Sequence, residues 1–192
     1  MAINRYILIL FIIGFVSVSN TTQAQYSLAI SGGYLTGFNS KPPHVYSQNV
    51  DQNWHQGYQA TINNGFKLSN TPFELTSKVG FKYLASKGSY NNISVETNTY
   101  KMILGIGGLY QVTNSFCTGL TINLENNFDF ENFITQTSNL FRYSIETNFY
   151  YQIIQNLDAS LSYSVALTPL SDHYLVTNPQ HQFTVGLRYR LR

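Results

Sequence analysis

The feature that most constrains this chain is a strict alternation of apolar and polar residues, which is clearest at its C-terminal end. Phe183, Val185, Leu187, Tyr189 and Leu191 share one parity, while small or polar residues occupy the other. A period of two is that of a β-strand whose two faces meet different surroundings. The pattern recurs upstream, and no stretch reads as an amphipathic helix. We therefore predict an all-β chain.

Eight segments follow this period. Their expected bounds are Tyr26–Phe38, Trp54–Leu68, Phe73–Ala85, Thr99–Val112, Phe116–Phe130, Asn139–Ile153, Leu157–Leu167 and Gln182–Leu191. The alternation has exceptions, because Asn64 and Thr147 fall on the apolar parity and Ile103 and Leu109 fall on the polar one.

The connections between these segments alternate in length. Three are tight, at Ser69–Pro72, Thr113–Ser115 and Ile154–Asn156. Four are long and polar: Asn39–Asn53, Ser86–Asn98, Glu131–Ser138 and Pro169–Gln180. In an up-and-down barrel, all long loops then leave one end and all tight turns the other. This is the sidedness of outer-membrane barrels, whose turns are periplasmic and whose long loops are extracellular, so both termini are expected in the periplasm.

The first 24 residues read as a secretory signal peptide. Arg5 supplies a positive start, Tyr6–Val18 is apolar, and Thr22-Gln23-Ala24 ends in a small residue. The apolar run is shorter than the roughly 20 residues that a spanning helix needs. We expect cleavage after Ala24, which leaves residues 25–192 as one barrel domain.

The composition agrees with a barrel in lipid. Only 10% of residues are charged, against about 25% in soluble domains, and 15% are aromatic. Such a chain suits one face in lipid and another lined by uncharged polar groups. Lys and Arg are scattered, which gives no support for nucleic-acid binding. Cys117 stands alone, so no disulfide framework is expected.

The polar parity is expected to line the interior with charges of both signs. Simple registers at the tight turns place Lys67 opposite Glu74 and Lys101 diagonal to Glu125. Buried charges have to be paired, and eight strands leave an interior just wide enough to be filled by side chains. A wide porin channel is therefore disfavoured.

The signal peptide, the eight alternating strands and the terminal strand Phe183–Arg192 together resemble the outer-membrane β-barrel domain family, which includes the small barrels of the OmpA and OmpX type. The resemblance implies an eight-stranded antiparallel up-and-down transmembrane β-barrel, porin-like in architecture, in the outer membrane of a Gram-negative bacterium. It also implies outer-membrane lipids and the barrel-assembly machinery as partners. The chain departs from the usual terminal strand by ending in Leu191-Arg192 rather than in an aromatic residue.

We expect a non-enzymatic protein with no cofactor and no catalytic residues, and with a structural or surface-interaction role through four long loops. Loop residues available to an unidentified extracellular partner are Tyr46, Tyr90, Asn91, Asn92 and Tyr174.

Two alternatives remain open. The first is a lipid-modifying enzyme like the lipid A deacylases, whose His-x-Ser element has no counterpart in His173-Tyr174-Leu175 or His181-Gln182-Phe183. The second is a secreted lipocalin-like carrier, although the Gly-x-Trp of that family is absent and an apolar interior would be required.

Four histidines, His44, His55, His173 and His181, fall in or beside the first and last long loops. Barrel closure would make these loops neighbours, and imidazole is a common ligand for zinc, copper and nickel. The simpler interpretation is ordinary polar loop residues, because no spacing matches a metal motif. No metal site is assigned on this basis.

Overall fold

A computed structural model describes residues 25–39, 54–68, 71–90, 93–128, 141–167 and 180–191. It contains the strands β1 Gln25–Asn39, β2 Trp54–Lys67, β3 Phe73–Tyr90, β4 Ile93–Gln111, β5 Phe116–Phe128, β6 Phe141–Ile154, β7 Leu157–Leu167 and β8 Gln180–Leu191. No helix of the described residues has the length and hydropathy needed to cross a membrane.

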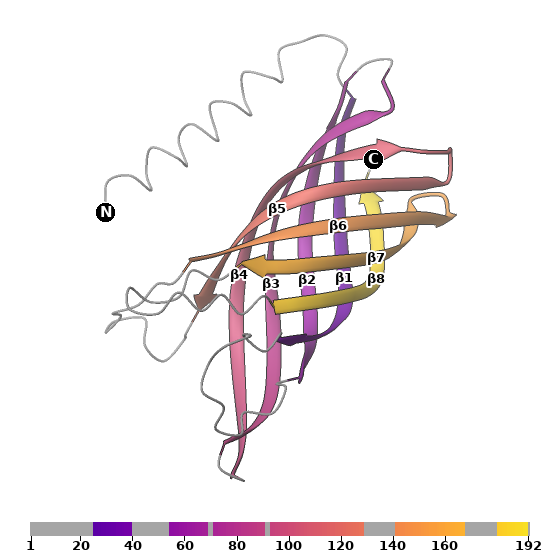
Figure 1. Cartoon of the computed structure of the whole chain (residues 1–192). Helices are drawn as coiled ribbons and strands as arrows, with labels where there is room; N and C mark the ends of the chain where they lie inside the picture. The colour runs from indigo at the N-terminus through magenta and orange to yellow at the C-terminus, as the bar shows by residue number, and fades with distance from the viewer. Residues whose placement is uncertain are drawn as a thin grey trace, which may run out of the picture.

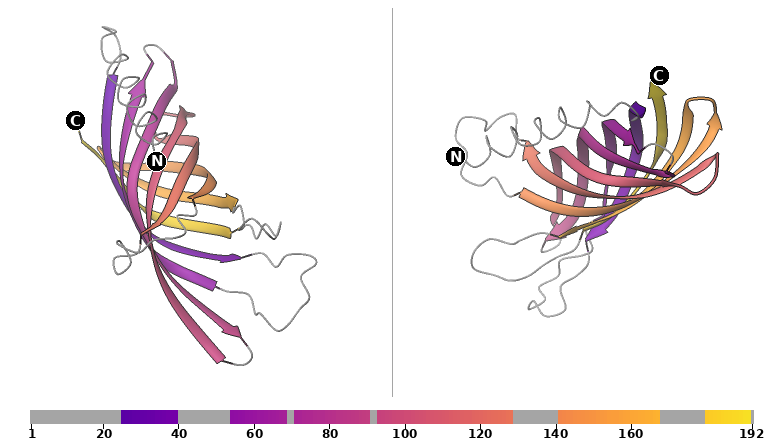
Figure 2. Two further views of the ribbon diagram at one scale, coloured as in Figure 1. Left: turned by 90° about the vertical axis from the view of Figure 1, so that its left-hand side faces the viewer. Right: turned by 90° about the horizontal axis from the view of Figure 1, so that it is seen from above.

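The strands form one closed antiparallel barrel in chain order, as the sequence predicted. Closure is made by β1 and β8, which pair continuously from Leu28 with Leu191 to Asn39 with Gln180. Figures 1 and 2 show strands that wrap obliquely around the barrel. A closed sheet leaves no unpaired edge, so its backbone can lie in a medium without water.

One end of the barrel, which we name the turn end, carries the tight turns. It also holds Gln25, paired with Lys67, and Leu191, paired with Leu28. Val112 donates a backbone hydrogen bond to Phe116 across the second turn, at 3.0 Å. The third turn contains Asn156 with φ 73°, a left-handed conformation in which asparagine is enriched.

The opposite end, the loop end, differs from the prediction at one connection. The segment Ser86–Asn98 was expected to be a long loop, but β3 continues to Tyr90 and β4 begins at Ile93, which are register partners. The hairpin extends past its neighbours at the bottom of Figure 1. The loop prediction was wrong because it rested on the polar composition of this segment. A paired strand that projects beyond the apolar belt needs no apolar face, so its residues can be as polar as those of a loop. The other three long connections lie largely outside the described residues.

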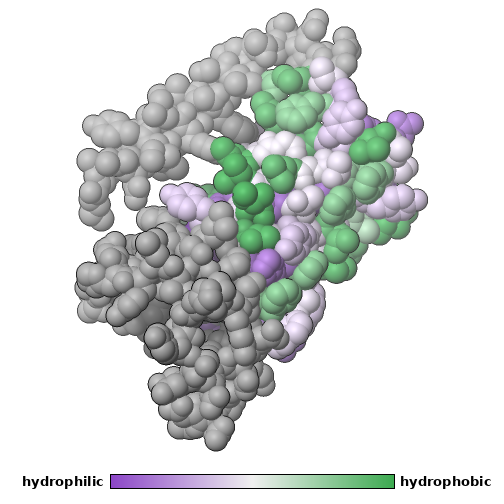
Figure 3. All heavy atoms as spheres, viewed as in Figure 1, coloured by the Kyte–Doolittle hydropathy of each residue, from purple (hydrophilic) through white to green (hydrophobic). Residues whose placement is uncertain are grey.

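The outer surface is apolar. Side chains of the middle belt expose between 40% and 53% of their surface on this face: Val79, Leu104, Ile106, Ile122, Ile145 and Leu187. Aromatic side chains lie exposed nearer the two ends, as at Tyr58 and Tyr100 toward the loop end and Tyr110 and Tyr151 toward the turn end. Figure 3 shows apolar patches across the described strands. This distribution matches the lipid-facing belt and aromatic girdles of membrane barrels.

The exceptions to the alternation keep their predicted parity. Ile103 and Leu109 are buried in the interior. Asn64 lies on the outer side, where its Oδ1 accepts a hydrogen bond from the Tyr26 hydroxyl at 2.8 Å. This hydrogen bond gives the amide oxygen a partner that lipid would not supply.

Gly186 is one of the positions at the seam between β1 and β8 that have no room for a side chain. A Cβ on Gly186 would lie 2.1 Å from the Gly32 carbonyl oxygen and 2.6 Å from the Gly33 Cα, both backbone atoms that cannot move independently. A Cβ on Gly32 would meet only the Gln59 carbonyl oxygen, at 3.9 Å.

We expect Gly186→Ala to lower the free energy of unfolding by about 1–3 kcal/mol, because the methyl group forces the two seam strands apart. Gly32→Ala is the matched control and should change stability little. Urea titrations of the barrel refolded in vesicles measure both. An equal effect of the two substitutions would contradict this close approach at the seam.

Candidate functional site

The interior of the barrel, the lumen, holds every charged side chain that the structure describes. These are seven cations and four carboxylates: Lys67, Lys78, Lys82, Lys101, Arg142, Arg188 and Arg190 against Glu74, Glu125, Glu146 and Asp158. The inward parity of each strand places them there, as the sequence predicted. The lumen is therefore the region of the described structure where charge and polar chemistry gather.

Glu125 of β5 is the centre of a cluster near the loop end. Its carboxylate accepts the Lys82 ammonium at 2.8 Å and the Lys101 ammonium at 3.4 Å. The Ser144 hydroxyl donates a third hydrogen bond, at 3.1 Å. Both carboxylate oxygens are thereby satisfied although Glu125 is only 1% exposed, which is the condition for tolerating a buried charge.

Two glutamines of β8 extend this cluster across the lumen. Gln182 accepts a hydrogen bond from Lys82 at 2.7 Å. Gln180 accepts from Arg142 at 3.1 Å and from Lys101 at 3.4 Å, and its amide nitrogen lies 3.3 Å from the His55 ring. The loop-end cluster therefore joins side chains of β2, β3, β4, β5, β6 and β8 into one connected network.

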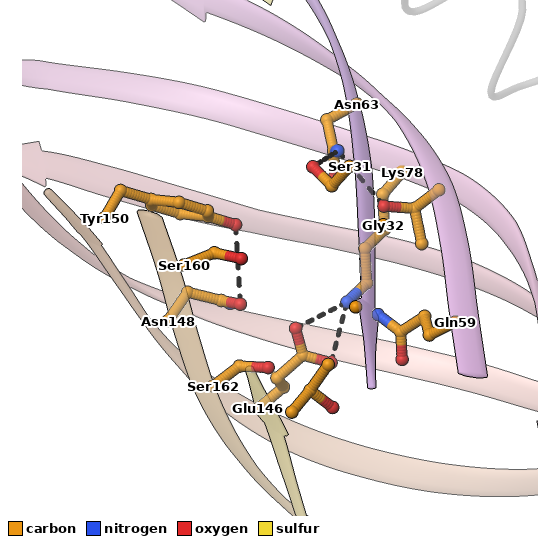
Figure 4. Close-up of a pocket in the computed structure, with 13 residues that line it drawn as sticks. Ser31, Gly32, Gln59, Asn63, Lys78, Glu146, Asn148, Tyr150, Ser160 and Ser162 are labelled. Carbon is orange, nitrogen blue, oxygen red and sulfur yellow. Dashed lines mark hydrogen bonds and ion pairs between the residues drawn. The ribbon is translucent and has the colours of Figure 1, made fainter. Parts of the chain in front are cut away.

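A second ion pair lies at mid-barrel. Lys78 reaches from β3 to Glu146 of β6 and donates to both carboxylate oxygens at 2.7 Å (Figure 4). Asn123 donates to the same carboxylate at 3.0 Å and to Ser144 at 3.2 Å, which links this pair to the loop-end cluster.

The turn end of the lumen is held by separate contacts. Arg190 forms an ion pair with Asp158 at 2.9 Å, and Arg188 lies over the Tyr150 ring. Lys67 and Glu74 are register partners, as predicted. Their hydrogen bonds go elsewhere, however: Lys67 donates to Gln111 at 3.1 Å, and Glu74 accepts from the Ser27 hydroxyl.

Two small cavities lie between these contacts. The larger, about 30 Å³, is lined by hydroxyl and amide groups around the Lys78–Glu146 pair (Figure 4). The smaller, about 10 Å³, lies beside Arg188. Volumes of this size hold one or two water molecules. Neither cavity has room for a lipocalin-type apolar ligand.

The histidines separate on the barrel wall. His55 is buried in the lumen, whereas His181 lies on the outer parity, where it stacks with Phe38 and its Nδ1 lies 2.7 Å from the Tyr163 hydroxyl. The two rings therefore face opposite sides of the sheet and do not share a site. His44 and His173 lie outside the described residues. The described part of the chain contains no cluster of three or more His, Cys, Asp or Glu side chains suited to a metal.

Sequence reasoning found the diagonal Lys101–Glu125 contact but missed Gln180 and Gln182 as its partners. The sequence analysis predicts a loop at Gln180 and assigns Gln182 to the terminal strand without naming a partner. Their inward parity in the terminal strand was the available signal. The partners themselves depend on distances across the lumen, which no local pattern contains.

Of the loop residues named for recognition, only Tyr90 is described, as the last residue of β3. Tyr46, Asn91, Asn92 and Tyr174 lie outside the described residues.

No protein-family model matches the chain, and no curated protein matches its sequence. Several solved structures, in contrast, are similar to its fold. The outer membrane protein OprG of Pseudomonas aeruginosa aligns with a TM-score of 0.52 at 11% identity, over 88% of this chain and 98% of that one. The attachment invasion locus protein Ail of Yersinia pestis aligns with a TM-score of 0.51 at 10% identity, over 87% and 99%. The chain has the fold of the small outer-membrane β-barrels. At such low identity the likeness concerns the fold alone.

We expect Glu125→Gln to destabilise the barrel by about 3–5 kcal/mol, because Lys82 and Lys101 lose the carboxylate that compensates their buried charges. The matched control is Glu74→Gln, which should cost at most about 1 kcal/mol, since an amide oxygen can still accept the Ser27 hydrogen bond. Unfolding midpoints in urea give both values. Equal losses would show that the loop-end cluster is no more critical than any other lumen contact.

Proposed function

We propose that this chain is an integral outer-membrane barrel without enzymatic activity, whose role is structural or lies in contacts at the cell surface. The observation that carries the proposal is the sorting of side chains by face. The wall is apolar at its middle belt and aromatic nearer both ends, while every described charge lies inside. A soluble lipocalin-like carrier needs the reverse arrangement, with apolar side chains inside and charges in water.

The closed lumen supports a role other than bulk diffusion. Lys82, Lys101, Glu125 and Gln182 are each at most 2% exposed, and their hydrogen bonds cross the lumen near the loop end. Eight-stranded barrels are narrow enough to be filled by their own side chains. The protein therefore acts through its surfaces. The connections at the loop end are the surfaces that we expect to contact other molecules.

The position of the turns supports one orientation of the barrel in the membrane. Membrane barrels keep short turns in the periplasm and send longer connections outside. Gln25, Leu191 and the tight turns share one end of the barrel. In the proposed topology this end is periplasmic, and the β3–β4 hairpin projects from the cell surface.

The location is tested by expressing the full chain in a Gram-negative host and inserting an epitope tag either at Asn114, in a tight turn, or at Tyr46, in a connection of the loop end. We expect the protein in the outer-membrane fraction, with the Tyr46 tag accessible on intact cells and the Asn114 tag accessible only after lysis. A soluble periplasmic protein would refute the membrane location. A surface-exposed Asn114 tag would reverse the topology.

The alternative, a lipid-modifying enzyme, is distinguished from the proposed function by whether the barrel changes lipids chemically. The His181 ring does face outward, but the hydroxyl described beside it is the phenol of Tyr163 rather than a serine. We expect lipid A and phospholipids incubated with the refolded barrel to keep their masses in mass spectrometry. If the wild type removed an acyl chain from the lipid and the His181→Ala variant did not, the enzymatic alternative would be established.

A further inference from the structure

Arg188 is a buried cation whose hydrogen-bonding capacity the barrel leaves incomplete. It is 5% exposed, and its buried Nε has no hydrogen-bond partner among the described residues. The guanidinium carbon lies 4.6 Å from the centroid of the Tyr150 ring. A cation–π contact offsets part of the cost of burial, but the face of a ring supplies no lone pair to the N–H groups at the edge of the guanidinium.

The nearby carboxylates are already engaged. Asp158 is the register partner of Arg188 on β7, yet its carboxylate accepts Arg190 at 2.9 Å. Glu146 accepts both of its short hydrogen bonds from Lys78. Glu74 accepts the Ser27 hydroxyl. The mid-barrel and turn-end contacts of the lumen therefore hold four cations and three carboxylates, an excess of one positive charge: Lys67, Lys78, Arg188 and Arg190 against Glu74, Glu146 and Asp158. Buried charge is costly unless it is paired.

A polar cavity adjoins this unbalanced cation. Arg188, Lys78, Thr121, Asn148 and Tyr150 are among the residues that line this space of about 10 Å³. Asn148 donates to the Thr121 oxygen at 3.1 Å, so the Thr121 proton is available for another acceptor. The larger cavity shares Lys78, Asn148 and Tyr150 with this space and continues toward mid-barrel.

We propose that this cavity binds one small monovalent anion, with chloride as the ligand of fitting charge and size. Arg188 supplies the charge and N–H donors, and Thr121 supplies a hydroxyl donor, while the charge of Lys78 is balanced by Glu146. One monovalent anion neutralises the local excess, and a cavity with room for about one water molecule admits a single-atom anion but not a polyatomic one such as phosphate. This site goes beyond the proposed surface role.

The loop-end cluster also carries excess positive charge, but its cations are differently placed. Lys82, Lys101 and Arg142 each donate to Glu125 or to a glutamine oxygen of β8. Arg190 also has an unpartnered Nε, yet it holds Asp158 directly and its side chain is 37% exposed. Arg188 is therefore the cation for which an added anion supplies a missing acceptor.

The test compares unfolding of the refolded barrel in sodium chloride and in sodium gluconate at equal ionic strength. A ligand that binds only the folded state raises stability with its concentration. We expect the urea midpoint of the wild type to rise with chloride and to level off. Arg188→Gln should weaken the apparent chloride affinity about tenfold or more, since a charge-assisted hydrogen bond is lost. Lys67→Gln removes a lumen cation away from the cavity and should keep the dependence.

General effects of salt on water act alike on both variants, so the difference between Arg188→Gln and Lys67→Gln isolates the site. If Arg188→Gln fails to refold, Thr121→Val removes one donor without removing charge and should also weaken binding. Chlorine NMR linewidths measured on the wild type give a direct reading, with broadening that bromide reverses by competition. Absence of broadening, or a chloride dependence that survives in both site variants, would overturn the proposal.

Discussion

The pairing of β1 with β8 is the interaction on which the rest of this structure depends. It removes the last open edge of the sheet, so that every strand has a neighbour on both sides. Without that pairing, a row of backbone N–H and C=O groups would face lipid at a cost of several kcal/mol each. The close approach of Gly33 and Gly186 at the seam shows how little space the pairing leaves.

Closure also determines where charge can go. Because one face of every strand is apolar, the Lys, Arg, Asp and Glu side chains that the structure describes share a narrow interior. Glu125 then compensates Lys82 and Lys101, and Glu146 compensates Lys78. The amide oxygens of Gln180 and Gln182 serve as neutral acceptors for cations that outnumber the carboxylates. Among these cations, Arg188 lies over the Tyr150 ring and beside a small cavity, where the other cations have a carboxylate or amide oxygen.

Because the belt and the lumen of such a barrel are constrained in this way, barrels of this kind can differ in function mainly at their two ends. The belt is constrained by lipid, and the described lumen is occupied by its own ion pairs. The β3–β4 hairpin is paired to its tip at Tyr90 and Ile93, so interstrand hydrogen bonds hold its backbone in place at the loop end. This arrangement supports the proposed surface role more directly than a flexible loop would.

The sequence by itself determined the eight strands, their two faces and the three tight turns at one end, because a period of two is a local property of a strand whose faces meet different surroundings. It also determined that Ile103 and Leu109 face inward, since parity decides the face whatever the side chain. It could not separate a polar loop from a polar strand at Ser86–Asn98, because water outside the belt removes the apolar signal. Only the tertiary structure decided which charges meet. Lys67 and Glu74 are opposite in register but bond elsewhere, and Lys78 meets Glu146 across the lumen, because those distances depend on how the closed sheet curves rather than on spacing along the chain.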